Sequence, residues 1–257
     1  MICVHDESNS CLLTLFGNYH PLLQKVSAER EADLYSAFVS KASSLGWQST
    51  YSDTSSPSLW GMEDAELEYE QVVDDAVAWV RVGLMDPAQP PQMTGSPLLP
   101  MALCAWEAVR DFGDLELRAV QFDFPIAAID SESVSIESLE TWLYPTPPAY
   151  NQLLGLTVSI DSGAAISQAE EAVLSSPVFE GIFSSIASDS TGRSFDNDRM
   201  VPGENENSSS RTLLRATAEI SRWGAVQGAC AATAIALALS QTGAEGSVTI
   251  RIEARPR

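Results

Sequence analysis

The residues most suited to chemistry are a group of carboxylates in the first third of the chain. They are Glu63, Asp64, Glu66, Glu68, Glu70, Asp74 and Asp75. Paired carboxylates can transfer protons in acid–base catalysis, and they can also hold hard cations such as Ca²⁺. However, Glu66, Glu68 and Glu70 alternate with Leu67 and Tyr69, which is typical of a strand with one face in solvent. We therefore predict a solvated acidic surface that could dock a basic partner, and no metal site.

A thiol and two histidines are the other candidate groups. Cys230 lies in a segment of small residues, 224–232, that reads GAVQGACAA. A helix that begins here could present backbone N–H groups to an anion, but small residues also let a helix pack closely against its neighbours, and we favour this second interpretation. His5 and His20 are the only histidines, so any His-based triad or metal site must use one of them. Neither has a visible partner, and the catalytic residues therefore stay unassigned.

The sequence offers little support for a metal or a nucleotide. Asp196, Asn197 and Asp198 resemble part of a calcium-binding loop, but the glycine and the terminal glutamate of an EF-hand are missing. The four cysteines are too far apart for a zinc site. The sequence contains no P-loop, GxGxxG, GxSxG or HExxH motif. We predict that the protein uses no metal and no cofactor.

The charge of the chain is large and unevenly distributed. The 257 residues include 14 basic and 35 acidic ones, which gives a net charge of −21. Residues 1–150 hold 23 acidic and 6 basic residues, whereas residues 211–257 hold 6 basic and 3 acidic ones. The excess of acid argues against nucleic acids and anionic membranes, because both are bound through Lys and Arg. It favours a basic protein partner, or contact of the acidic part with the basic end, within the chain or head to tail between copies.

The expected location is the cytoplasm. The N-terminal residues become polar by His5 and lack the apolar core of a signal peptide. The longest uncharged run, residues 225–242, contains polar residues and is less apolar than a membrane span. Four cysteines in a chain of this length also favour a reducing compartment.

The first half of the chain predicts the order strand, helix, hairpin, helix, strand. Residues 11–16 form a short apolar run typical of a buried strand, and a helix is expected from about Ala28, with Ser27 as its N-cap. Residues 66–84 predict a hairpin, divided at Asp74-Asp75. A second helix starts at Ser96-Pro97. The expected buried stripes of the two helices are Leu34, Tyr35, Phe38, Ala42 and Leu45, and Leu99, Leu103, Trp106, Val109 and Phe112.

A strand over residues 115–124 closes this half. Its apolar residues alternate as Leu115, Leu117 and Ala119, and the alternation then shifts to begin again at Val120. Such a change of phase predicts a β-bulge.

The second half predicts a similar order of elements. Residues 154–160 and 248–254 alternate cleanly between apolar and polar side chains, which indicates strands. A helical stretch runs from about Ala165 to Ile186 and is interrupted at a proline, and residues 225–240 predict a buried helix. Residues 211–223 fit both a strand and a helix, and we favour the strand because the corresponding part of the first half is strand-like.

These patterns predict an α+β fold of two tandem ferredoxin-like (split βαβ) units of about 110 residues each, with their sheets edge to edge or face to face. The expected units are residues 1–143, strongly acidic, and 144–257, with a polar mobile loop at 188–210. Internal duplication remains an open alternative, because the two halves share an order of elements and almost no sequence.

The leading functional prediction is a non-catalytic interaction or assembly protein that acts through its acidic surface. Its partner would be a basic protein or a second copy, and neither a nucleic acid nor a membrane. The alternative is an enzyme or small-molecule-binding protein with a pocket between the two units, with His20, Cys230 or the carboxylates of residues 63–75 at its edge.

Overall fold

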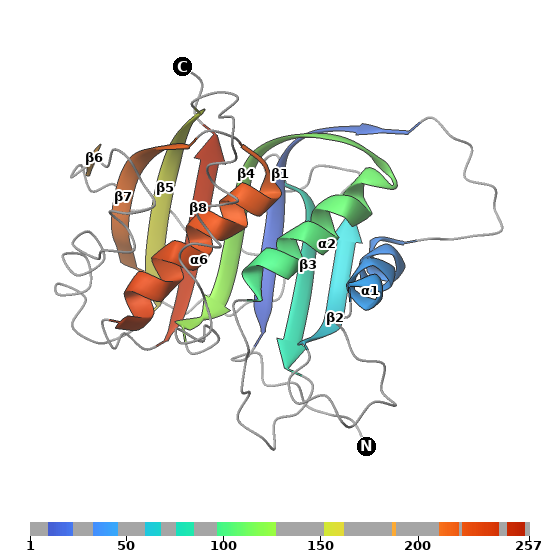
Figure 1. Cartoon of the computed structure of the whole chain (residues 1–257), viewed down its shortest axis with the longest axis horizontal. Coiled ribbons are helices and arrows are strands. Elements are labelled where there is room, and N and C mark those ends of the chain that lie inside the picture. The colour runs from blue at the N-terminus through green and yellow to red at the C-terminus, as the bar shows by residue number, and fades with distance from the viewer. Residues whose placement is uncertain are drawn as a thin grey trace.

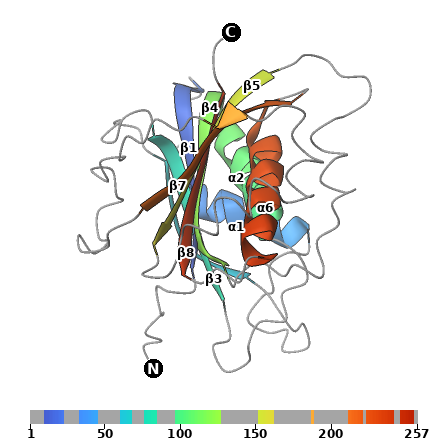
Figure 2. The ribbon, with the colours of Figure 1, turned by 90° about the vertical axis from the view of Figure 1, so that its left-hand side faces the viewer.

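The chain folds as a mixed α+β structure, in which one antiparallel sheet carries helices on one face (Figures 1 and 2). The computed structural model describes residues 10–22, 33–45, 60–67, 76–84, 97–126, 152–161, 187–188, 211–220, 223–241 and 246–254. Within them the strands are β1 (Cys11–Pro21), β2 (Trp60–Leu67), β3 (Ala76–Leu84), β4 (Gly113–Pro125), β5 (Gln152–Asp161), β6 (Ala187–Ser188), β7 (Arg211–Ile220) and β8 (Ser247–Ala254). The helices described are α1 (Leu34–Ser44), α2 (Leu98–Arg110) and α6 (Ala225–Gln241). The predicted α+β class is confirmed.

The sheet has eight strands in the order β2-β3-β1-β4-β8-β5-β7-β6, and every neighbouring pair is antiparallel. A hairpin is present as β2 and β3, but its first strand begins at Trp60, earlier than the predicted range of residues 66–84, and the predicted division at Asp74-Asp75 lies outside the described residues. Read outward from the β4–β8 pair, one side of the sheet is β4-β1-β3-β2 and the other side is β8-β5-β7-β6. If the four strands of each half are numbered in chain order, both sides have the order four, one, three, two. The two halves of the chain thus repeat one strand order on either side of β4–β8, which we call the seam.

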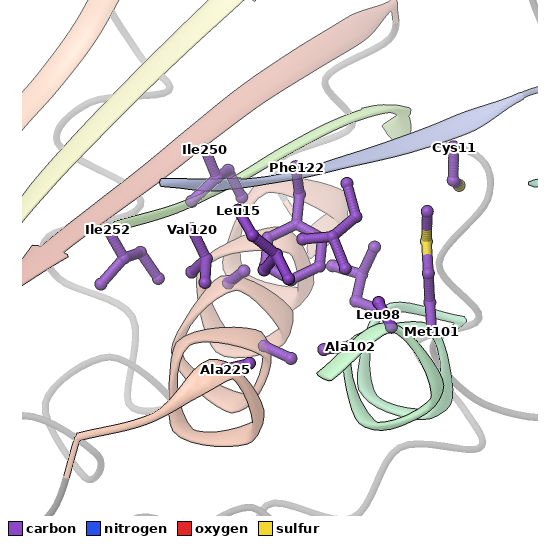
Figure 3. Close-up of a cluster of buried hydrophobic side chains, with 14 of the residues drawn as sticks. Cys11, Leu15, Leu98, Met101, Ala102, Val120, Phe122, Ala225, Ile250 and Ile252 are labelled. Carbon is purple, nitrogen blue, oxygen red and sulfur yellow. The ribbon is translucent and has the colours of Figure 1, made fainter. Parts of the chain in front are cut away.

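At the seam, β4 and β8 form a continuous ladder, and the side chains on its helix-covered face are buried. Its pairing runs from Ala119↔Glu253 to Pro125↔Ser247. Val120 and Phe122 of β4 and Ile250 and Ile252 of β8 are fully buried and lie toward α2 and α6 (Figure 3). Burying an apolar side chain of this size stabilises a fold by about 1.5–3 kcal/mol. The core therefore runs across the seam and does not divide into one core for each half.

Helix α1 begins later than the sequence predicted. Its N-cap is Asp33, whose carboxylate accepts a hydrogen bond from the backbone N–H of Ser36 at 2.7 Å. The predicted N-cap, Ser27, is therefore wrong for this helix and itself lies outside the described residues. The predicted stripe is buried at Leu34, Phe38 and Ala42, whereas Tyr35 and Leu45 at its margins are 38 % and 56 % exposed.

The buried face of α2 also differs from the prediction. The fully buried residues are Leu98, Met101, Ala102, Cys104, Ala105, Ala108 and Val109. Of the predicted stripe only Val109 is among them, and the other four residues are half-buried. The reason is that α2 lies between α1 and α6 and above the sheet, so it is buried around more of its circumference than a single stripe, and small residues such as Ala102, Ala105 and Ala108 are buried beside Leu98 and Met101.

The predicted β-bulge in β4 is present. Phe16 of β1 pairs with Ala119 and Gly17 pairs with Leu117, so Arg118 is the extra residue. A Cβ atom at position 17 would lie 2.1 Å from the carbonyl oxygen of Glu116, so only glycine allows this close approach.

The second half agrees with the prediction where it is described. Residues 211–220 form a strand, and α6 and β8 occupy the predicted ranges. Ser188, the first residue of the predicted loop, belongs to β6, while residues 189–210 and the whole of the predicted helical stretch lie outside the described residues. Among the helices described, none combines the length and the apolar character needed to cross a membrane.

Helix α6 is buried along nearly its whole length because it is built from small residues. Gly228 allows close packing on β4, since a Cβ atom there would lie 2.4 Å from the Cγ2 atom of Val120. Just before the helix, the indole N–H of Trp223 donates a hydrogen bond to the carbonyl oxygen of Leu117 at 2.9 Å. This bond satisfies a β4 backbone group beyond the end of the β8 ladder, so α6 and Trp223 tie the second half to the first.

Candidate functional site: charged edges and a polar seam

The acidic run lies partly on β2, which is the outermost strand at one end of the sheet (Figure 1). Asp64 and Glu66 are exposed, and Glu63 is half-buried. The other four carboxylates of the run, at positions 68–75, lie outside the described residues. β2 therefore presents two solvated carboxylates at an edge of the sheet, which is the kind of surface that the alternation of residues 66–70 predicted.

Glu63 has a structural role that its two acidic neighbours lack. The β2–β3 register shifts between Met62 and Asp64, so Glu63 is the extra residue of a bulge. Its carboxylate lies over Gly83, where a Cβ atom would come within 1.9 Å of Oε1, and it accepts a hydrogen bond from the hydroxyl of Ser10 at 2.7 Å. A bulge in an edge strand disturbs the regular ladder and discourages unselective pairing.

Near the opposite end of the sheet, β7 contains two arginines and one glutamate, and the two-residue strand β6 lies beyond it. β6 pairs with β7 only at Ala187↔Thr217 and Ser188↔Ala216. Arg211 and Arg215 precede that short contact, and on the inner side they pair with Ile160 and Thr157 of β5. The sequences of β2 and β7 thus differ in net charge.

A third polar group lies at the seam, on the face opposite the helices. Gln121 and Asp123 alternate with the buried residues of β4, and Thr249 faces Asp123 from β8. The carboxylate of Asp123 accepts one hydrogen bond from the hydroxyl of Thr249 and one from the side-chain amide of Gln121, the latter at 3.0 Å. Burial raises the pKa of Asp123, although both hydrogen bonds act in the opposite direction. The bond from Thr249 ties the two halves together by side chains as well as by backbone, and the bond from Gln121 lies within β4.

Arg251 extends this polar group across β4 to β1. Its Nε atom donates to Glu253 at 2.6 Å, and its guanidinium lies 4.2 Å from the ring centroid of Phe16. A guanidinium over an aromatic face is attracted by the ring electrons. No pattern in the sequence indicates this polar group, because alternating polar residues in a strand look the same whether they meet water or one another.

The remaining candidates do not form a site together. Cys230 is fully buried, and burial raises the pKa of its thiol to about 12. His20 is exposed at the end of β1, opposite Asp114 of β4. A buried neutral thiol and a surface histidine cannot act as a nucleophile and its base. His5 and residues 196–198 lie outside the described residues.

The other two described cysteines are also buried, and burial raises the pKa of their thiols as it does for Cys230. Cys11 and Cys104 are buried and free, and burial raises the pKa of Cys104 to about 11. Burial also raises the pKa of Cys11, and the negative charge of Glu63 adds to this effect. Within the described part of the chain, no three His, Cys, Asp or Glu side chains are grouped as a metal site would require.

Comparisons with protein-family models, with curated proteins and with solved structures find no match for this chain.

Proposed function

We propose that the protein is a non-catalytic interaction or assembly protein that binds a basic partner through the acidic edge formed by β2. One observation carries the proposal: β2 is the last strand of the sheet, and Asp64 and Glu66 are exposed along it. An edge strand offers backbone N–H and C=O groups to a partner strand. The carboxylates repel a second β2 and attract a strand that brings Lys or Arg, so the charge selects the partner.

The architecture that would present this edge is a pair of tandem ferredoxin-like units, residues 1–143 and 144–257, related by internal duplication. The repeated strand order on the two sides of the seam supports this part of the proposal. In the first half the described order is β1-α1-β2-β3-α2-β4, the order of a split βαβ unit. The boundary between the units would fall between β4 and β5.

A cytoplasmic location is also part of the proposal. Three described cysteines, Cys11, Cys104 and Cys230, are free and buried, as is typical of proteins kept in a reducing compartment. The partner would then be a basic cytoplasmic protein, or a second copy of the chain.

Binding to a short oligolysine peptide tests the proposal. The variant carrying Asp64→Lys and Glu66→Lys should bind the fluorescent peptide about tenfold more weakly than the native protein, because two attractions become repulsions. Fluorescence anisotropy at several salt concentrations measures the affinity, and circular dichroism confirms that the variant is folded.

The matched control carries Asp114→Lys and Glu116→Lys, which are exposed carboxylates of β4 and change the net charge by the same amount. This control should retain most of the affinity. Equal losses in both variants would mean that the peptide responds only to net charge, and the acidic edge would then have no special role.

The second candidate function, an enzyme or small-molecule-binding protein with a pocket between the units, is favoured by a different observation. Asp123, Gln121 and Thr249 gather where the halves meet. A small molecule that raises the Tm of the native protein but not of the Asp123→Asn variant would favour this function. The lysine substitutions on β2 should leave such a response unchanged.

A further inference from the structure

Asp64 and Glu66 lie on the same face of the sheet, but they have different neighbours on β3. In the β2–β3 ladder Asp64 lies opposite Arg81, and Glu66 lies opposite Trp79. Side chains directly opposite one another in an antiparallel pair share a face, with Cβ atoms about 4.5–5.5 Å apart. Asp64 is therefore faced by a cation of the chain itself, whereas Glu66 is faced by a neutral aromatic ring.

The face that carries Glu66 and Trp79 is the one opposite the helices. The next residue along β3, Val80, is in register through Leu13 with Phe122, which lies toward α2 and α6 (Figure 3). Trp79 is half-buried and Glu66 is exposed. Within the described part of the chain, neither side chain has a hydrogen bond, an ion pair or a cation contact. A solvated carboxylate and a partly accessible ring thus lie side by side.

The same face already holds one guanidinium between a carboxylate and a ring. Arg251 of β8 pairs with Glu253, and its guanidinium lies 4.2 Å from the ring centroid of Phe16 on β1. Arg251 belongs to the same cross-strand row as Trp79. Because β4 lies between β8 and β1, this arginine reaches across a whole strand, which is about 10 Å at two strand spacings.

We infer that the acidic edge selects an arginine of its basic partner, whose guanidinium lies over the ring of Trp79 and pairs with the carboxylate of Glu66. The inference rests on the proposed function, because it names the side chain that the β2 edge recognises. A partner strand paired with β2 would be separated from β3 by two strand spacings, the same separation that Arg251 spans to Phe16. An arginine of that strand can therefore reach the ring of Trp79.

The chemistry of the two groups favours arginine over lysine. A guanidinium is planar, so it can stack on an aromatic ring and still present its edge to a carboxylate. A lysine ammonium is a compact and strongly hydrated charge, so it gains less from the ring. The edge should therefore discriminate between two partners of equal charge, which net charge alone would not do.

Two peptides of equal length and charge test the inference. They alternate threonine with either arginine or lysine, and fluorescence anisotropy measures both affinities at the same salt concentration. The native protein should bind the arginine peptide about fivefold more tightly than the lysine peptide, because a cation over a partly exposed ring contributes on this scale. Trp79→Leu should reduce this preference to less than about twofold, because it removes the ring.

Two charge-matched variants separate the ring and carboxylate from the charge of the whole edge. Glu66→Gln and Asp64→Asn each remove one exposed carboxylate from the same face of β2. Both should weaken the binding of both peptides, but only Glu66→Gln should also remove the preference for arginine, because Asp64 faces Arg81 instead of the ring.

Trp106→Leu is the control for the loss of a half-buried tryptophan, since Trp106 lies on α2, and it should keep the full preference for arginine. Circular dichroism verifies that each variant is folded. Glu66→Gln changes an exposed side chain, so it keeps the test valid if Trp79→Leu does not fold.

Two results would overturn the inference. The first is equal affinity of the native protein for the two peptides, and the second is a folded Glu66→Gln or Trp79→Leu variant that keeps the full preference for arginine. Either result would leave the proposed function standing if the β2 lysine variant still lost affinity for oligolysine. If that variant bound oligolysine as tightly as the native protein does, the proposed function would fail together with the inference.

Discussion

The seam and the ends of the sheet are both built from antiparallel strands, but they differ in how far these strands are paired and buried. At the seam, β4 and β8 exchange a full ladder, with apolar side chains on one face and hydrogen-bonded polar side chains on the other. At its ends, the described sheet finishes with β2, which pairs with β3 alone, and with β6, which pairs with β7 along two residues. The difference shows that pairing and burial hold the side chains of the seam, whereas Asp64 and Glu66 on β2 remain exposed to solvent.

Removing a large side chain from the seam should have the largest effect on stability. Phe122 is fully buried there, and Phe122→Ala should lower the free energy of unfolding by about 3–5 kcal/mol because it leaves a cavity between the sheet and the helices. Leu67→Ala on the edge strand is the comparison and should cost nearer to 2 kcal/mol, because Leu67 packs at the margin of the core. Urea denaturation measures both. Equal losses would contradict the view that the core is centred on the seam.

Filling the close contact between α6 and β4 should have the next largest effect. Gly228→Ala places a Cβ atom against the stiff side chain of Val120, and we expect a loss of about 1–2 kcal/mol even after the gain in helix propensity. The control is Gly224→Ala, where the nearest atom is the flexible end of Gln227, and its effect should stay within about 0.5 kcal/mol. A neutral or stabilising Gly228→Ala would mean that α6 can move away from the seam without cost.

The helix nearest the acidic edge depends on a single cap. Asp33→Ala removes the acceptor for the N–H of Ser36 and should cost about 1 kcal/mol. That hydrogen bond lowers the pKa of Asp33, so its contribution is present above the ordinary pKa of an aspartate and is lost as the pH falls through the lowered value. Denaturation at neutral and acidic pH measures this. Asp33→Asn, which keeps an acceptor, should retain most of the stability, and an equal loss in both variants would contradict the role as a cap.

The contribution of Asp123, on the polar face of the seam, to the free energy of unfolding should change with pH in the direction opposite to that of Asp33. Because burial raises the pKa of Asp123, the folded protein holds the proton of this carboxyl more tightly than the unfolded chain does. The contribution of Asp123 to stability therefore falls as the pH rises through the ordinary and then the raised value, and it stays low above them. Asp123→Asn should lose this dependence and gain relative stability toward neutral pH. Denaturation from pH 4 to pH 8 measures the difference, and parallel curves would contradict it.

Sequence periodicity was sufficient to predict most of the elements. Strands β1, β5 and β8 follow local alternation or apolar runs, and the bulge near Arg118 follows a visible change of phase. The start of α1 was mispredicted because Ser27 and Asp33 are both good caps, and nothing local decides between them. The buried face of α2 was mispredicted because contact with two neighbouring helices favours small residues, and periodicity gives weight to large ones.

The parts that the sequence could not predict depend on contacts between distant residues. No local pattern indicates that Thr249 donates a hydrogen bond to Asp123, which is 126 positions away. Nor does one indicate that the guanidinium of Arg251 lies over the ring of Phe16. The strand order likewise depends on which strands pair with each other, so nothing in the sequence indicates that β2 lies at one end of the sheet. Of the candidate site, the acidic strand could be predicted, and its position at an edge could not.

Hydrogen–deuterium exchange with and without the oligolysine peptide tests the central claim most directly, because it reports on the seam and the acidic edge in one experiment. We expect the amides of Trp60–Leu67 to become more protected when the peptide is added, while those of Ala119–Pro125 are already protected and do not change. Protection that appears on the outer faces of the helices, or none on β2, would contradict the claim that the acidic edge is the contact surface.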